Sequence, residues 1–192
     1  MSKIDQLKEV KAECFACTKC PLHKGDKKVS SPHVFGRGNV NAKVMVVGQN
    51  PGFNETVQKK PFIGAAGKNF DAFLAEIGMS RKDFYITNTV KCYSPGNRAP
   101  KSNEIAACKS ILQREIEIVK PKLILVLGNY ALQYFIKETG ITSKHGMVIK
   151  SLEFDIPVFV MYHPSPMNMN KSAIKQEARA DFERLKAHLE TI

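Results

Sequence analysis

The stretch KVMVVGQNPG, residues 43–52, decides the fold class. Its first half is an uninterrupted apolar run that ends at Gly48, and such a run is typical of a strand buried on both faces of a parallel sheet. Its second half is a polar loop, which is bounded by glycines and stiffened by Pro51. The stretch therefore predicts a central strand that leads directly into a candidate functional loop.

Strand and helix patterns alternate on both sides of this stretch. Further strands are expected at 84–90, 123–127 and 158–162. Helices are expected at 3–13, after Gly67, at about 102–119, from Gly128 to about Lys137, and at about 172–189; residues 139–151 indicate only a loop and a short strand. This alternation predicts a three-layer α/β/α sandwich around a mainly parallel, four-stranded sheet. We expect one domain over residues 1–192, with residues 1–41 docked on it as a cysteine-containing extension.

The chain has 192 residues and a formal net charge of +11, from 29 Lys and Arg against 18 Asp and Glu. The excess lies in residues 1–61 and 81–122, which also contain all five cysteines. Such a balance favours a polyanionic partner. No apolar run approaches the roughly 18 residues of a membrane span, and Met1–Asp5 has no apolar signal-peptide core. We therefore expect a cytoplasmic protein without a membrane partner.

The cysteines form a candidate metal framework. Cys17-x-x-Cys20 supplies two thiols from one turn, and Cys92 and Cys108 supply two more from the end of a strand and the following helix. Four thiolates suit either zinc or an iron–sulfur cluster, and the spacing does not choose between them. Two alternatives stay open: Cys14 could pair with Cys17 instead, and Cys108 could simply pack on a buried helix face.

Four segments lie just past the expected strand ends, where ligands of such sheets bind: residues 48–52, 88–92, 128–130 and 163–170. In the first, the adjacent amides of Gln49 and Asn50 can fix a ligand or orient a water molecule. Asn88 places a polar amide at the end of an apolar strand, where burial is costly without a partner. His163 stands before two prolines that fix its loop. A purely structural histidine is the competing interpretation.

One aromatic residue completes this set. Phe62 lies in PFIGAAG, residues 61–67, beside a glycine-rich helix entry. A core role is the competing interpretation for Phe62.

The ordered set of motifs resembles the uracil-DNA glycosylase superfamily, and most closely its iron–sulfur family 4. The matching pieces are Cys17-x-x-Cys20, Gly48–Gly52, PFIG at 61–64, ITNTVKC at 86–92, Asn97-Arg98-x-Pro100, Cys108 and His163-Pro164. The resemblance implies a structural 4Fe–4S cluster held by Cys17, Cys20, Cys92 and Cys108, with Cys14 free and zinc as the less favoured occupant.

The resemblance also implies roles in releasing a base from DNA. Phe62 and Gly52 would contact a base flipped out of the helix, and Asn88 would pair with its polar edge. His163 would donate a hydrogen bond to the departing base, as a neutral group. These roles describe a monofunctional DNA glycosylase that acts on uracil and initiates base excision repair.

The water-handling loop departs from the family 4 pattern, Gly-Glu-Ala-Pro-Gly. Gln49 replaces the acidic residue, and Asn50 stands at the alanine position. An amide orients water but is not a useful general base, so we expect Asn50 to position the water. The change puts narrow uracil specificity in doubt, and other deaminated bases become candidates. Glu55 matches an acidic position of family 4, against the alternative of an exposed loop carboxylate.

The remaining expectations concern DNA contacts. The loop HPSPMN, residues 163–168, would enter the minor groove with Ser165, Met167 and Asn168, and Met167 would be the wedge. Candidate phosphate contacts are Lys91, Arg98, Lys101 and Lys171. We expect a monomer whose partner is DNA with a damaged base; recruitment by a sliding clamp stays open. The alternative function is a non-catalytic iron–sulfur DNA-binding protein on the same fold.

Overall fold

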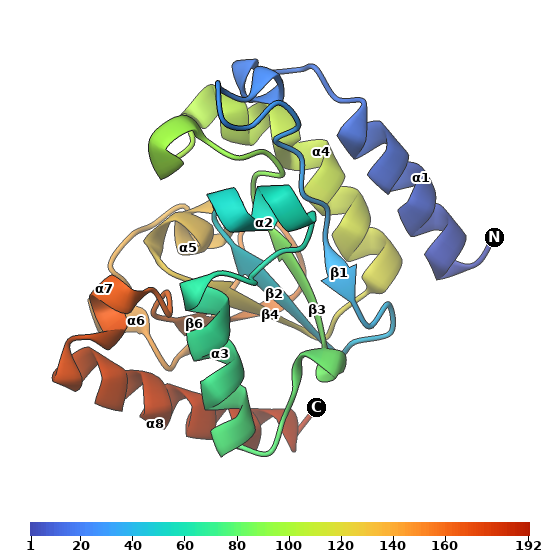
Figure 1. The fold of residues 1–192 in the computed structure, drawn as a ribbon. Coiled ribbons are helices and arrows are strands. Elements are labelled where there is room, and N and C mark those ends of the chain that lie inside the picture. Colours follow the sequence, from blue (N-terminus) through green and yellow to red (C-terminus); the bar gives the residue numbers. More distant parts are fainter.

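The computed structural model describes all residues, 1–192, and its centre is a six-stranded sheet in the order β1-β3-β2-β4-β6-β5 (Figure 1). The strands are β1 (Arg37–Gly38), β2 (Val44–Gly48), β3 (Phe84–Asn88), β4 (Leu123–Leu127), β5 (Val148–Lys150) and β6 (Pro157–Met161). The four inner strands are parallel, which confirms the predicted fold class. The sheet is wider than predicted, because the short strands β1 and β5 add antiparallel edges.

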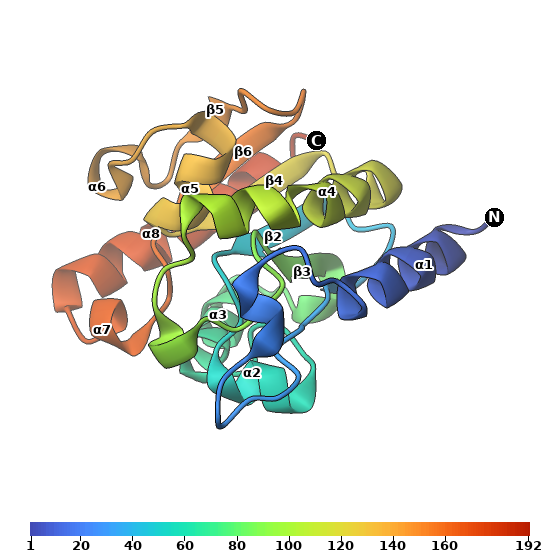
Figure 2. The ribbon, with the colours of Figure 1, turned by 90° about the horizontal axis from the view of Figure 1, so that it is seen from above.

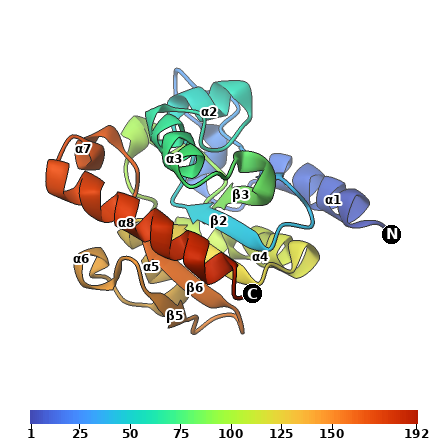
Figure 3. The same cartoon turned by 90° about the horizontal axis from the view of Figure 1, so that it is seen from below.

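Helices cover both faces of this sheet (Figures 1 and 3). They are α1 (Lys3–Phe15), α2 (Phe53–Gln58), α3 (Ala65–Glu76), α4 (Ser102–Val119), α5 (Asn129–Ile136), α6 (Ile141–Lys144), α7 (Pro166–Met169) and α8 (Ser172–Leu189). Short 3-10 helices lie at η1 (Pro21–Lys24), η2 (Arg81–Asp83) and η3 (Pro95–Asn97). No helix combines the length and the apolar composition that crossing a membrane requires.

Alternation along the strands produces two separate cores. Met45 and Val47 face the core that α1, α4 and α5 cover. Val44 and Val46 face the other core, which α3 and α8 cover. Because successive side chains of a strand point to opposite faces, the apolar run predicted to be buried on both sides fills both layers.

The N-terminal segment packs against the rest of the molecule. Helix α1 buries Val10 and Cys14 in the core beside α4, and the following segment lies between α2 and α4 (Figure 2). Backbone bonds fix it to the chain beyond β3: the Val34 N–H donates to the Lys91 carbonyl at 2.7 Å. These contacts bring Cys17 and Cys20 close to the segment that carries Cys92.

Candidate functional site: a cleft at the strand ends beside a cysteine pocket

The carboxyl ends of β2 and β3 lie side by side and begin the site. The register pairs Gly48 with Asn88. Beyond the strands, the chain stays paired: the Thr89 N–H donates to the Gly48 carbonyl at 2.9 Å, and the Val90 N–H donates to the Gln49 carbonyl at 3.0 Å. These bonds fix the start of the predicted water-handling loop. The strand β3 itself ends at Asn88, two residues earlier than the predicted 84–90.

A cleft of about 690 Å³ opens at this edge of the sheet, a size that suits a small-molecule group or a nucleobase. Its walls come from the segments at the strand ends and from the loop that carries Phe62. The predicted residues among its lining are Gln49, Asn50, Gly52, Glu55, Phe62, His163, Ser165, Met167 and Asn168.

Phe62 lies close both to His163 and to Asn88. The Phe62 and His163 ring centroids are 5.9 Å apart. Asn88 and Phe62 meet at Gly48: a Cβ there would lie 2.5 Å from the Asn88 Oδ1 and 2.5 Å from the Phe62 ring. The Asn88 Nδ2 is buried and has no hydrogen-bond partner. Such an unpaired donor is costly, and its pairing with a ligand would remove that cost.

The position of Phe62 is imposed by its surroundings. Its backbone has a φ of 54°, in the left-handed region that a phenylalanine rarely adopts. The guanidinium of Arg81 holds this segment, because it donates to the carbonyls of Pro61, Phe62 and Gly67. Asp71 pairs with Arg81 from α3. The ring is therefore held in place before any ligand arrives.

His163 is a neutral imidazole at ordinary pH. Burial lowers its pKa to about 4, because no charged partner offsets the lost hydration of the cation. Its loop is braced from two sides: the Asn168 Nδ2 donates to the His163 carbonyl at 2.8 Å, and the Asn69 Nδ2 donates to the Pro164 carbonyl at 2.9 Å. The imidazole is thus held in the cleft as an uncharged group.

Glu55 is a half-buried carboxylate on α2 that lines the cleft, not the exposed loop group of the competing interpretation. The Gly52 N–H donates to its Oε2 at 3.2 Å. Burial raises the pKa of Glu55, while backbone amides of Gly52 and the segment around Phe62 act in the opposite direction. Glu55 thus ties the water-handling loop to the aromatic loop. The Asn50 amide lies in the same cleft and donates to the Pro51 carbonyl at 3.2 Å.

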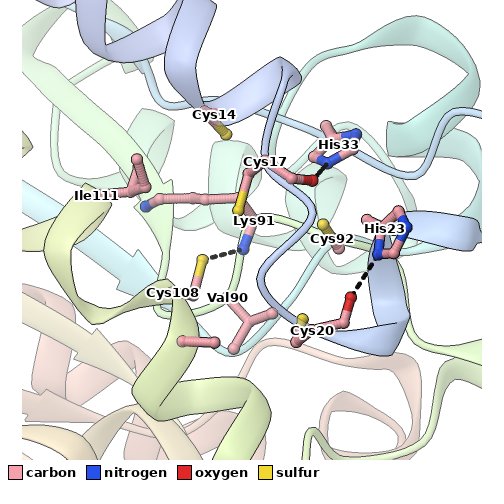
Figure 4. Close-up of a pocket in the computed structure, with 11 residues that line it drawn as sticks. Cys14, Cys17, Cys20, His23, His33, Val90, Lys91, Cys92, Cys108 and Ile111 are labelled. Atoms are coloured by element: carbon pink, nitrogen blue, oxygen red, sulfur yellow. Dashed lines mark hydrogen bonds between the residues drawn. The ribbon is translucent and has the colours of Figure 1, made fainter.

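The five cysteines lie around a second, apolar pocket (Figure 4). Its lining includes Cys14, Cys17, Cys20, Cys92 and Cys108, together with His23, His33 and Lys91. Both histidine rings contact backbone carbonyls of the cysteine segment: His23 that of Cys20 at 2.6 Å and His33 that of Cys17 at 3.2 Å. The topology therefore gathers thiols from three segments that are distant in the sequence.

The chemistry of this donor set fits an iron–sulfur cluster. Thiols from these segments face one apolar cavity, and burial raises the pKa of Cys92 and that of Cys108, the latter to about 11. Buried thiols of this kind ionise when a metal supplies positive charge. The Lys91 N–H already donates to the Cys108 Sγ at 3.3 Å, a bond that stabilises a ligating sulfur. No group of three or more His, Cys, Asp and Glu side chains is arranged to hold a single metal ion.

The predicted phosphate contacts divide into three kinds. Lys101 and Lys171 are exposed at the N-terminal ends of α4 and α8. Arg98 is engaged by Glu104, with bonds of 2.9 Å and 2.7 Å. Lys91 is wrong as a phosphate contact: its side chain is 1% exposed and pairs with Glu115 inside the protein.

The predicted groove-entering loop is exposed at the cleft rim. Met167 is 74% exposed on α7, so its side chain is free to contact a partner. Ser165 precedes the helix as its N-cap residue. Tyr130 is a cleft residue to which the sequence analysis gave no role, and it is 51% exposed. Its place just past β4 was the signal that could have identified it.

Comparisons with known proteins identify the family of this chain. The family model of the uracil DNA glycosylase superfamily matches residues 35–188. The chain is 33% identical to a type-4 uracil-DNA glycosylase of Archaeoglobus fulgidus over 95% of this chain and 92% of that protein. It is 37% identical to the type-4 enzyme of Sulfurisphaera tokodaii (95% and 84% covered) and 38% identical to that of Thermotoga maritima (90% and 89%). The chain belongs to the uracil DNA glycosylase superfamily. Within it, these relatives are of the type-4 group.

Proposed function

We propose that this protein is a uracil-DNA glycosylase of the type-4 kind, which hydrolyses the bond between base and deoxyribose and so initiates base excision repair. One observation supports this most strongly. A held aromatic ring and a neutral imidazole line one cleft at the strand ends, and an unpaired buried amide lies behind the ring, at Gly48. The type-4 names of relatives that match over most of their length point to the same activity.

Base recognition follows from Phe62 and Asn88. Flipping a nucleotide out of DNA costs a few kcal/mol, which contacts in the pocket offset. The Phe62 ring would stack on the flipped base beside Gly52. The Asn88 amide both donates and accepts, so it suits the O4 and N3–H of uracil. The buried Nδ2 would find its missing partner in this base.

Departure of the base is assisted by His163. As the glycosidic bond breaks, its electron pair moves to N1 of uracil, and the negative charge spreads to O2. A neutral N–H of His163 can donate to that oxygen, and the exclusion of water by bound DNA would strengthen such a bond. Phe62, whose ring lies beside the imidazole, would align the base with this donor.

The water molecule that attacks C1′ of the sugar would be oriented by Asn50, with Gln49 beside it. Its oxygen forms the new bond to C1′, and its proton passes to the solvent or to Glu55. Burial raises the pKa of Glu55, which makes this carboxylate a better proton acceptor than an exposed one. Glu55 would thus accept a proton, which the amide side chains of Gln49 and Asn50 cannot do.

The cysteine pocket would hold a structural 4Fe–4S cluster through Cys17, Cys20, Cys92 and Cys108, with zinc the less favoured occupant. When bound, the cluster supplies a covalent cross-link between the N-terminal segment, the end of β3 and α4. None of the five cysteines forms a disulfide, which accords with a reducing compartment, and we propose the cytoplasm.

DNA would lie across the rim of the cleft. Met167 would fill the space left by the flipped base, while Ser165 and Asn168 shape its loop. Lys101 and Lys171 would contact phosphates. The main contact of Arg98 would remain its ion pair with Glu104 inside the protein. We propose that the protein acts as a monomer.

The test is uracil release from a uracil-containing oligonucleotide, scored as alkali-labile sites in single-turnover experiments. Asn50→Ala, Asn88→Ala and His163→Ala should each slow cleavage by about 10²-fold or more. Asn54→Ala, an exposed amide on α2 outside the cleft, is the matched control and should cleave at the wild-type rate. A wild-type protein that binds this DNA without releasing uracil would instead support the non-catalytic alternative. Hypoxanthine, xanthine and mispaired thymine in the same assay define the breadth of specificity.

A further inference from the structure

A separate cleft of about 580 Å³ lies on the far side of the loop that carries Phe62. Arg37 of β1, Lys60 after α2 and Lys82 of η2 line it, together with Arg81. Asp71 is its one acidic residue. Three elements that are distant in the sequence thus direct basic side chains to one hollow.

Most of this positive charge is unpaired. Asp71 is engaged by Arg81. Arg37, Lys60 and Lys82 have no carboxylate within 4 Å, so none of them is held in an ion pair. Cations that surround a concave surface raise the local concentration of anions. The expected ligand of the cleft is therefore negatively charged.

The cleft adjoins the base-binding site directly. Pro61 and Ile63 line it, while Phe62 between them lines the base-binding cleft. The Arg81 guanidinium stands on this shared wall and donates to the Pro61 carbonyl at 3.3 Å. The two clefts therefore lie on opposite sides of one short wall, residues 61–63.

We propose that this second cleft binds backbone phosphates of the DNA, outside the segment that contains the flipped nucleotide. The proposal rests on the proposed function, which supplies the DNA. No aromatic side chain lines the cleft, so it has no platform on which the base of a free nucleotide would stack. Guanidinium and ammonium groups without a ring suit phosphodiester groups, which position a strand without reading its sequence.

The test compares Lys60→Ala/Lys82→Ala with Lys150→Ala/Lys186→Ala. The second pair removes equal charge from exposed lysines that line neither cleft. Affinity for a duplex is measured by fluorescence anisotropy over a range of KCl concentrations. Each lost phosphate contact lowers the slope of log K against log salt by about 0.9. For the cleft variant, the magnitude of this slope should therefore be smaller than that of wild type by about 1 to 2. The control variant should have the wild-type slope.

Uracil cleavage at saturating DNA should stay within about twofold of wild type in the cleft variant, because neither lysine lines the base-binding cleft. A slope unchanged from that of wild type would overturn the proposal. A second result would also overturn it. Calorimetry would show that inorganic phosphate binds the wild type but not the cleft variant, while the salt slope of DNA binding is the same in both proteins. The cleft would then bind a free anion and not the DNA backbone. A reduced slope in a protein that binds DNA but releases no uracil would leave this proposal standing and overturn the proposed function alone.

Discussion

The Lys91 ammonium lies against the Glu115 carboxylate, and both side chains are sealed from solvent, with 1% and 0% exposed. Lys91 also donates to the Asn88 carbonyl at 2.6 Å and to the Thr87 Oγ1 at 2.7 Å. Its own N–H donates to the Cys108 Sγ. This buried pair therefore connects the cysteine pocket to the strand end that carries the Asn88 amide.

Replacing one partner of this pair should destabilise the protein strongly. Lys91→Met leaves the Glu115 charge buried without its cation, which costs about 3–5 kcal/mol in such settings. Lys91→Met/Glu115→Gln removes both charges, while the new amide oxygen can still accept from Tyr85 and Thr87, which now donate to Glu115. The double variant should recover most of the lost free energy of unfolding. Urea denaturation measures both; equal stability of Lys91→Met and wild type would contradict the buried-charge argument.

The sequence predicted the inner sheet well, because burial on both faces leaves an unambiguous apolar run. The strand predicted at 123–127 has those bounds in the structure, and the one at 43–47 is shifted by one residue. The edge strands β1 and β5 were missed because they have two and three residues and no continuous apolar pattern. Helix α2 was missed for a similar reason, since its six residues are too few for a helical periodicity.

Part of the candidate site could be predicted from the sequence for a different reason. Parallel strands bring their carboxyl ends to one edge, so Asn88 and His163 could be placed near each other without coordinates. Burial of Lys91 could not be foreseen, because its partner Glu115 lies far along the chain, on the helix α4. A lysine beside a cysteine in a basic segment predicted a surface group. Only the packing of α4 on the sheet shows that it is internal.

The ligand set of the cysteine pocket can be tested by single replacements. Cys17→Ala and Cys108→Ala should each lose iron and the visible absorption of the cluster. Cys14→Ala is the matched control: it lines the same pocket, and burial raises the pKa of its thiol to about 12. This variant should keep its iron and its absorption. Iron loss in Cys14→Ala, with iron retained in Cys17→Ala, would show that a different set of thiols holds the cluster.

Gly48→Ala should damage the base pocket more than the fold. The added Cβ would lie 2.5 Å from the Asn88 Oδ1 and from the Phe62 ring, so one of these groups must move. Overpacking of this kind costs about 1–3 kcal/mol. Cleavage of uracil-containing DNA should fall by about 10²-fold or more, because a misplacement of about 1 Å can cost that much. Unchanged affinity for undamaged DNA would show that the fold persists. Wild-type cleavage would show that the Gly48 contacts do not set the pocket.

The partly buried imidazole of His163 should make stability depend on pH in one defined window. Its pKa is about 4 in the folded protein and about 6.5 in an unfolded chain. Above a pH of about 6.5 both states are neutral, and the histidine carries no penalty. As the pH falls from about 6.5 towards about 4, the histidine binds a proton in the unfolded chain but not in the folded protein. The free energy of unfolding therefore falls by up to about 1.4 kcal/mol per pH unit.

His163→Asn removes this linkage, and its stability should fall less steeply than that of wild type across the same window. Denaturant melts at several pH values between about 7.5 and about 4.5 measure the two slopes, and other groups that titrate contribute equally to both proteins. The NMR signals of the His163 ring provide a direct check, since between about pH 8 and about pH 5 they should move by no more than about a tenth of their full titration shift. Parallel stability curves, or a ring that titrates near its ordinary pKa of about 6.5, would mean that the imidazole is hydrated and can become a cation. Its proposed role as a neutral donor to the departing base would then be wrong, because near neutral pH a large share of the protein would carry an imidazolium in the cleft.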